Sequence, residues 1–180
     1  MTLFILYNNL MKIQDKEINI RKLKPSDINQ PEKFQKHINS FIPEDAMLLI
    51  KKKKTRKEEV EWLKGRIKEV RKKKTIYLVA ENPSVNLGQV GEIIGACHIA
   101  LCRERMDHIA GFGIAIKQGY GGFGLGKYLM QEVIKLSKIE LKPAPKIIEL
   151  EVYGCNKPAI ALYKKMGLKA YYAFNGNFSQ

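Results

Sequence analysis

The sequence predicts a mixed α/β domain of the α+β type, with one central, mostly antiparallel sheet of about six strands flanked by about four helices. Segments with the apolar period of strands and of helices follow one another in the order β, α, α, β, β, β, α, β, α, β. A crossover helix joins only one pair of strands near a glycine-rich run, so the sheet is neither all-parallel nor doubly wound. The chain has 180 residues, 45% of them hydrophobic, which suffices for one domain with a core. We expect residues 1–180 to form that domain, with residues 1–16 as a candidate N-terminal extension.

The first half of the chain predicts one strand and two helices. Residues 17–23 alternate between apolar and polar and predict the first strand, which ends before a proline. Ser26 or Asp27 is a suitable N-cap for a helix toward residue 41, and we expect a loop from there to residue 50. Thr55 and Glu58 have the spacing of a capping box, which predicts an amphipathic helix to about residue 73.

Three strands are expected in the middle of the chain. Residues 75–81 and 92–101 are rich in apolar and β-branched side chains, and the segment between them contains one proline and two glycines. This pattern predicts an antiparallel hairpin. A second turn, over residues 103–107, leads into a third strand over residues 108–117.

The third of these strands runs into a glycine-rich segment, residues 118–124, after which a helical pattern extends from Leu125 to about residue 139. A strand, a glycine turn and a helix in this order present the unpaired N–H groups of a helix N-terminus to an anion. Glycines also let the backbone approach phosphate oxygens closely. Lys127 adds a positive charge in the first helical turn. The pattern therefore predicts a pyrophosphate-binding site.

Three phosphate-binding motifs fit this segment. Gly119, Gly121 and Gly124 satisfy the dinucleotide fingerprint GxGxxG, and residues 121–127 match most of a P-loop, GxxxxGK. The P-loop lacks its Ser or Thr because residue 128 is a tyrosine, and the mixed sheet disfavours both motifs. The third candidate is residues 122–126, which look like the loop that holds the pyrophosphate of coenzyme A in acyltransferases.

The last part of the chain predicts a strand, a short helix and a final strand. Two prolines within residues 142–145 end the preceding helix, and residues 146–153 alternate as a strand. Residues 156–166 predict a short helix that Gly167 closes as a C-terminal cap. Residues 168–174 predict the last strand.

Composition disfavours several other classes of protein. No apolar run approaches the roughly 18 residues of a membrane span, and the N-terminal segment lacks the features of a signal peptide. Met11 is a candidate natural start, since a polar stretch follows it. The cysteines are odd in number and lie in apolar sequence, so we expect reduced thiols in a cytoplasmic protein and no metal site at Cys97, His98 and Cys102.

The net charge is +14, and much of it lies in two lysine runs, residues 51–54 and 72–74. Such a charge is compatible with a nucleic-acid surface. Aromatic residues do not interleave with these lysines as a stacking platform requires, so we interpret them as solvated helix ends and loops. Their field would attract an anionic cofactor.

Two stretches, GIAIKQGYGGFGLGKYLM and LEVYGCNKPAIALYKKMGL, together resemble the GNAT superfamily of acetyl-CoA-dependent N-acetyltransferases. The second stretch is similar to enzymes that acetylate the N-terminal alanine of ribosomal proteins, with Glu151, Asn156 and Tyr163 in their E-x₄-N-x₆-Y arrangement. The resemblance covers about residues 75–168. This chain has Gly121 where the family usually has Arg or Gln, and it ends soon after residue 174, where the family commonly closes its acceptor site with a further strand.

The resemblance implies acetyl-CoA as co-substrate, no metal, and a primary amine as acceptor, either a protein N-terminus or a small molecule. Tyr163 would be the general acid and Glu151 the candidate base. A backbone N–H near Ile116 would face the developing oxyanion. The implied cofactor-binding residues are Ile114, Ala115, Ile116, Gly121, Gly122, Phe123, Gly124, Leu125, Gly126, Lys127 and Asn156.

Each assignment has a structural alternative. Tyr163 would otherwise be a core aromatic residue, Glu151 a partner for lysine, and Asn156 a helix cap. His98 and His108 are alternative bases, but both also fit ordinary strand histidines. We expect the acceptor pocket to be built by residues 41–50 and the C-terminal strand.

Two other classes of function stay open from the sequence: a non-catalytic acyl-CoA-binding module and a basic nucleic-acid-binding protein. We expect neither a membrane nor a nucleic acid as partner, and either a monomer or a homodimer.

Overall fold

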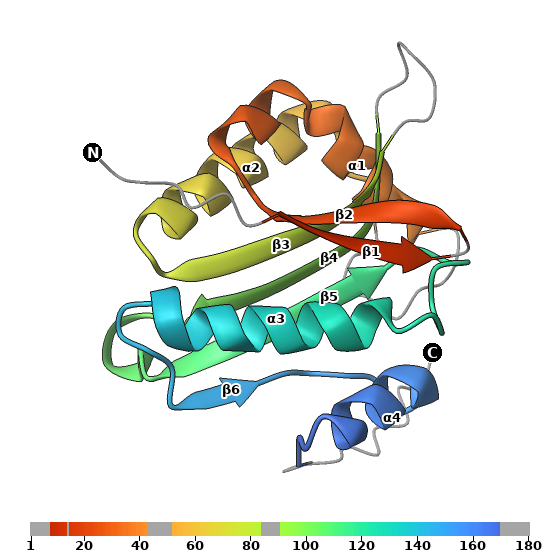
Figure 1. Cartoon of the computed structure of the whole chain (residues 1–180). Helices are drawn as coiled ribbons and strands as arrows, with labels where there is room; N and C mark the ends of the chain where they lie inside the picture. Colours follow the sequence, from red (N-terminus) through yellow and green to blue (C-terminus); the bar gives the residue numbers. More distant parts are fainter. Residues whose placement is uncertain (1–7, 14, 43–51, 84–90, 170–180) are drawn as a thin grey trace, which may run out of the picture.

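The computed structural model describes residues 8–13, 15–42, 52–83 and 91–169. In these ranges six strands form one sheet in the order β1-β2-β3-β4-β5-β6, so strands consecutive in the chain are neighbours in the sheet (Figure 1). Neighbouring strands are antiparallel except β5 and β6, which are parallel, and this confirms the predicted mixed sheet. The strands are β1 (Asn8–Ile13), β2 (Lys16–Lys22), β3 (Thr75–Asn82), β4 (Glu92–Leu101), β5 (Ile109–Ile116) and β6 (Ile147–Glu149).

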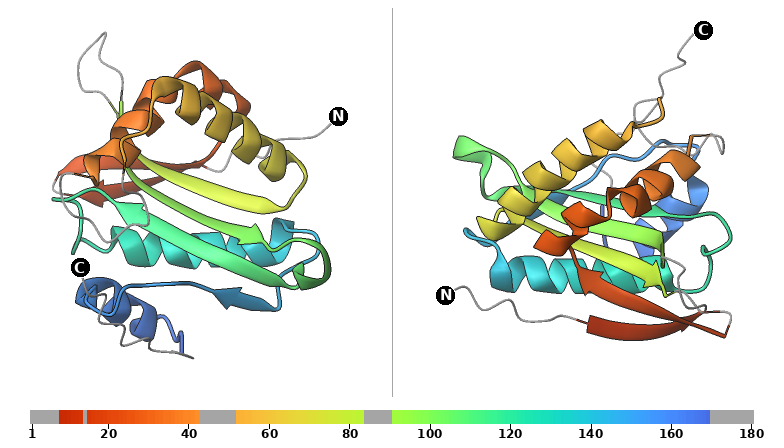
Figure 2. Two further views of the ribbon diagram at one scale, coloured as in Figure 1. Left: turned by 180° about the vertical axis from the view of Figure 1, so that it is seen from behind. Right: turned by 90° about the horizontal axis from the view of Figure 1, so that it is seen from above.

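Helices cover both faces of the sheet, as the two views of Figure 2 show. Alternate side chains of β3 separate two cores: Leu78 packs with α3, whereas Tyr77 and Val79 pack with α1 and α2. No helix in the described ranges has the length and apolar content that a membrane crossing needs. The helical elements are η1 (Pro25–Asn29), α1 (Pro31–Ser40), α2 (Arg56–Arg71), η2 (Glu104–Met106), α3 (Leu125–Glu140) and α4 (Lys157–Lys165).

Residues 8–13, which belong to the candidate N-terminal extension, form an edge strand of the sheet. β1 pairs antiparallel with β2, from Asn8 opposite Arg21 to Ile13 opposite Lys16. An edge strand hydrogen-bonds on one side and needs few apolar side chains, so here Ile13 is buried while Leu10 stays exposed. The strand also lies beside the start of α3, because a Cβ added at Gly124 would be 3.7 Å from Cε of Met11.

Two further elements are shorter than the sequence predicts. The helix expected over residues 26–41 is divided into η1 and α1, because Pro31 has no N–H group for a continuous helix and Gln30 leaves the helical conformation (φ −133°, ψ 52°). β6 covers three residues instead of 146–153, since its pairing with β5 ends at Glu149. Of the strand expected over 168–174, the first two residues are irregular and the others lie outside the described residues.

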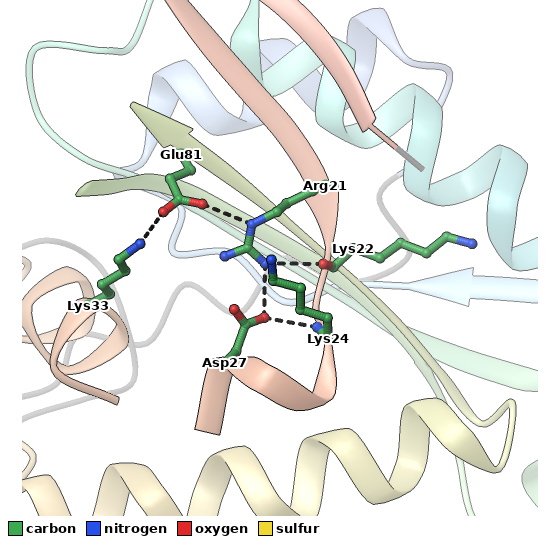
Figure 3. Close-up of polar contacts among 6 residues, drawn as sticks. All are labelled: Arg21, Lys22, Lys24, Asp27, Lys33 and Glu81. Carbon is green, nitrogen blue, oxygen red and sulfur yellow. Dashed lines mark hydrogen bonds and ion pairs between the residues drawn. The ribbon is translucent and has the colours of Figure 1, made fainter. Parts of the chain in front are cut away.

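A buried ionic cluster fixes the α1–α2 layer to the sheet (Figure 3). Arg21 of β2 donates to Glu81 of β3 and to Asp27 of η1, each over 2.9 Å, and Lys33 of α1 pairs with the second carboxylate oxygen of Glu81. Each of these four side chains is at most 14% exposed. Burial acts to raise the pKa of Glu81, but the hydrogen bonds from Lys33 and Arg21 outweigh it and lower that pKa. The cluster thus determines where α1 lies on the sheet.

Candidate functional site

A groove of about 1700 Å³ lies where β5 and β6 separate. The two strands pair only between Ile109–Gly111 and Ile147–Glu149. Beyond this short ladder, one wall of the groove is β5 up to Ile116, and the opposite wall is the chain from Glu149 to Tyr153. The glycine-rich run and α4 line one part of the groove, and α1 and α2 line another.

The amides of Ile114 and Ile116 point into the space that β6 leaves open. At one end of β5, Ile109 accepts from the backbone N–H of Cys102, and just after the other end Lys117 donates to Ile94, so both groups face β4. Backbone groups alternate in direction along a strand, and the β4–β5 register is continuous, so Ile114 and Ile116 face away from β4. Ala115 also lines the groove, but its backbone groups face β4.

The glycine-rich run leads into the N-terminus of α3, and three of its glycines have a left-handed backbone conformation. Gly119, Gly122 and Gly124 have φ values of 84°, 83° and 84°, which favour glycine. Gly124 is the N-cap and no side chain caps the helix. The first helical hydrogen bond runs from Tyr128 N–H to Gly124 over 3.0 Å, so the N–H groups of residues 125–127 have no partner within the helix. These N–H groups, at the positive end of a 16-residue helix, favour an anion.

The predicted residues of this run contribute in different ways. Among the described residues, no atom lies within 4 Å of a Cβ added at Gly121 or Gly122, so their backbone is open to the groove that they line. Phe123 is exposed, and Leu125 is buried in the core beneath the helix start. A Cβ at Gly126 would lie 3.1 Å from Ile116 Cδ1 and 3.2 Å from Leu162 Cδ2, so this glycine lets α3 pack against both β5 and α4. Sequence reasoning gave Gly126 an anion-binding role only.

Tyr163 lies on α4 and reaches the groove from the side opposite β5. Its ring is half-buried and meets the ring of Phe112 edge-on, with centroids 6.0 Å apart. Burial raises the pKa of its phenol above the usual 10.0, so the hydroxyl keeps its proton at neutral pH. No described side chain hydrogen-bonds to this hydroxyl, which leaves it available to a ligand.

Asn156 and Glu151 both line the groove. Asn156 is the N-cap of α4, and its Oδ1 accepts from the N–H of Ala159 over 3.2 Å. The cap alternative for Asn156 is therefore correct, and the cap leaves its Nδ2 group for other partners. Glu151 is exposed in the irregular segment after β6, not on the strand where it was expected.

The two histidines that were alternative bases lie in different parts of the structure. His108 precedes β5 at the end remote from the glycine-rich run, and it does not line the groove. His98 lines the groove from β4, stacked on Tyr77 with ring centroids 5.6 Å apart. Burial, together with the charge of Arg66, lowers the pKa of His98 to about 4, so at neutral pH the ring is uncharged and only weakly basic.

Sequence reasoning missed the residues of α1 and α2 that line the same groove, notably His37, Glu59 and Trp62. Glu59 is buried although it is charged, and it lies four and eight residues before the buried Leu63 and Ile67. This spacing places Glu59 on the inward face of α2, and it was the signal in the sequence that could have found it. Residues 43–51, most of the loop from which an acceptor wall was expected, lie outside the described ranges.

Comparisons with known proteins identify the family of this chain. Residues 44–168 match the acetyltransferase (GNAT) family. The chain is 35% identical over 80 residues to L-amino acid N-acetyltransferase AaaT of Escherichia coli (strain K12), across 44% of this chain and 48% of that protein. It is 35% identical over 106 residues to a putative ribosomal protein bS18-alanine N-acetyltransferase of Bacillus subtilis (strain 168), across 56% and 62%. The chain thus matches between about half and three-fifths of the length of these curated relatives.

Solved structures agree with the fold. An acetyltransferase of the GNAT family from Streptococcus pneumoniae aligns with a TM-score of 0.64 and 26% identity, over 84% of this chain and 83% of that one. The putative acetyltransferase yncA from Salmonella typhimurium, solved with its cofactor acetyl-CoA, aligns with a TM-score of 0.63 and 15% identity, over 88% and 79%. Because the family match spans well over half of the sequence, the chain belongs to the GNAT acetyltransferase family.

Proposed function

We propose that the groove binds acetyl-CoA, with the pyrophosphate at the N-terminus of α3 and the pantetheine arm along β5. One observation carries this proposal: the uncapped N–H groups of residues 125–127, the outward amides of Ile114 and Ile116, and Tyr163 all border one groove. A pyrophosphate would satisfy the N–H groups of the helix, and an amide-containing arm would continue the ladder that β6 leaves unfinished. The Salmonella structure with acetyl-CoA has the same fold and supports this placement.

The other predicted cofactor residues complete this arrangement. Gly121, Gly122 and Gly124 let the backbone approach phosphate oxygens without a Cβ in the way, and Lys127 adds charge in the first turn. Asn156 would donate from Nδ2 to the cofactor near its thiol end, because the helix cap uses only Oδ1. The assignment requires no side chain at Gly121, where the family usually places Arg or Gln.

The proposed reaction is a direct attack by a neutral primary amine on the thioester carbonyl. The amine nitrogen forms a bond to the acetyl carbon as the carbon–sulfur bond breaks, so the nitrogen loses one proton and the sulfur gains one. The N–H of Ile116 would donate to the carbonyl oxygen as its negative charge develops. Tyr163 would give the proton to the sulfur, and Glu151, directly or through water, would accept the proton of the amine.

The acceptor is a primary amine, either a protein N-terminus or a small molecule. The spacing of Glu151, Asn156 and Tyr163 favours a protein N-terminus, and the Bacillus relative carries the name of such an enzyme. The Escherichia coli relative is named for L-amino acids, which makes a small-molecule amine the second candidate.

The test combines ligand binding and turnover. Thermal-shift measurements with acetyl-CoA, CoA and ATP should show stabilisation by the two coenzyme A species and none by ATP. Turnover would then be measured with short peptides that differ in their first residue and with free amino acids. Stabilisation by ATP alone would contradict the proposal. Binding of acetyl-CoA without turnover of any amine would favour the non-catalytic alternative.

A further inference from the structure

The groove does not end at β5, because it continues across the sheet to the underside of α1 and α2. Tyr77 of β3, His98 of β4 and Gly113 of β5 are register partners and form one row across three strands. A Cβ at Gly113 would lie 2.4 Å from Cε1 of His98, so the glycine lets the imidazole ring lie over β5. Trp62 of α2 meets Tyr77 edge-on, with ring centroids 5.4 Å apart. Aromatic rings therefore line the groove from β5 to α2.

Glu59 is a buried carboxyl group at this end of the groove, and burial raises its pKa to about 7. It is 5% exposed, it lines the groove, and none of the described residues forms a hydrogen bond or ion pair with it. The nearby charges have other contacts: Lys54 pairs with Glu58 at 4.0 Å, and Arg66 lies over the ring of Trp62. A buried carboxylate without a partner is costly, so a ligand that supplies a positive charge would stabilise it.

His37 presents a second unsatisfied acceptor in the same wall. Its Nδ1 lies 3.0 Å from the carbonyl oxygen of Ile93, and since a carbonyl can only accept, Nδ1 carries the proton. Nε2 is then a bare acceptor, and it is buried with no partner in the described part of the chain. Burial lowers the pKa of His37 to about 4, so the ring remains neutral at physiological pH. Ionised Glu59 and Nε2 of His37 both accept hydrogen bonds and line the same groove, and an ammonium group can donate to each of them.

We propose that the α1–α2 end of the groove is the acceptor site, where the carboxylate of Glu59 binds the ammonium of an amine whose neighbouring substituent is apolar. This inference rests on the proposed function and names the acceptor class for the same groove. Phe34, Trp62 and Tyr77 supply the apolar wall beside the carboxylate. Glu59 is thus a binding residue for the acceptor. The bound ammonium gives one proton to water before the neutral amine attacks, and the proton that the nitrogen loses in the attack goes to Glu151 as proposed above.

Direct binding of a probe amine tests the proposal without any turnover. The probe is 2-phenylethylamine, and 2-phenylethanol is its uncharged analogue, both titrated calorimetrically into the full chain with and without CoA. We expect the amine to bind the wild type and to lose about 10- to 100-fold in affinity in Glu59→Gln, because a charge-assisted contact is lost. The affinity for the alcohol should be the same in the wild type and in Glu59→Gln. Glu69→Gln, which changes another glutamate of α2 outside the groove, should behave as the wild type.

Turnover separates a failure of this proposal from a failure of the proposed function. In Glu59→Gln, the KM for the amine should rise by the same factor, while the KM for acetyl-CoA stays unchanged. Equal affinity of wild type and Glu59→Gln for the amine would overturn the proposal, as would failure of the amine to bind the wild type with and without CoA. Binding of the amine through Glu59 without any response to acetyl-CoA would instead refute the proposed function and leave the amine site standing.

Discussion

The ring of Tyr163 meets the ring of Phe112 at 87°, with the two centroids 6.0 Å apart. This contact joins α4 to β5 across the groove. Phe112 belongs to the core on the α3 side of the sheet. An edge-on aromatic pair restrains the tyrosine ring through apolar packing. The position of the hydroxyl relative to the amides of β5 is therefore set by packing.

Replacement of Tyr163 with phenylalanine should separate catalysis from structure. The ring and its contact with Phe112 remain, so the melting temperature and the affinity for acetyl-CoA should stay near the wild-type values. Loss of the proton donor should lower kcat about 10²- to 10⁴-fold, measured by release of free CoA. The raised pKa of Tyr163 also predicts that the wild-type rate shows no loss from its deprotonation below pH 10. An unchanged kcat in the phenylalanine variant would exclude Tyr163 as the acid.

The stability of the protein should depend on pH through Glu59. Burial raises the pKa of Glu59 to about 7 from 4.5, although Lys54 acts in the opposite direction and Glu58 in the same one. The folded state thus holds this proton more tightly than the unfolded state, and the associated stability is present below pH 4.5 and is lost as the pH rises through 7. Glu59→Gln should therefore stabilise the protein by about 3 kcal/mol at pH 8 and by almost nothing at pH 4.5.

Denaturant unfolding of the wild type and Glu59→Gln at these two pH values measures the difference. Glu69→Gln is the control and should show no such dependence. A loss of stability in Glu59→Gln at pH 8 would mean that the carboxylate has a structural partner.

The buried ionic cluster should be the most sensitive charged site of the fold. Glu81→Gln leaves Arg21 and Lys33 buried without their shared carboxylate, so the free energy of unfolding should fall by about 3–5 kcal/mol. The matched control is Glu32→Gln, which breaks an exposed pair with Arg56 and should cost far less stability. Urea unfolding at neutral pH gives both values, and similar losses in the two variants would contradict the role given to the cluster.

Gly113 and His98 should be energetically coupled. Gly113→Ala places a methyl group against the imidazole ring, and we expect a loss of about 1–3 kcal/mol of stability from this overpacking. In a His98→Ala background the ring is absent, so the same glycine substitution should cost far less. A double-mutant cycle in urea measures the coupling, and additive effects would show that the ring does not lie over β5.

The strand, glycine turn and helix around residues 109–140 were predictable because each part has a strong local signal. Glycines at positive φ and a continuous apolar face on α3 do not depend on distant contacts. The same holds for α2, whose capping box at Thr55 and Glu58 forms as the sequence predicts. These elements carry most of the cofactor side of the groove.

The remaining elements depend on tertiary contacts that a single sequence does not reveal. β1 is an edge strand whose polar residues need only β2 as a partner, and β6 ends where β5 no longer pairs with it. The sequence alone assigns His37, Trp62 and Glu59 to helices and does not reveal that they line a groove. That groove is formed only when α1 and α2 pack over β3 and β4. The burial of Glu59 can be predicted from the apolar pattern of α2, but its function depends on what the groove binds.

The affinity of CoA for two variants of Gly124 tests the central claim most directly. In the described part of the chain, no atom lies closer than 3.7 Å to a Cβ added at the left-handed Gly124. Asn and Asp, which both tolerate this conformation, should therefore fit equally well and differ only in charge. Calorimetric titration should then show that Gly124→Asp binds CoA at least about tenfold more weakly than Gly124→Asn, because its carboxylate repels the pyrophosphate. Equal affinities for CoA in the two variants would contradict the account, since the pyrophosphate would then lie elsewhere.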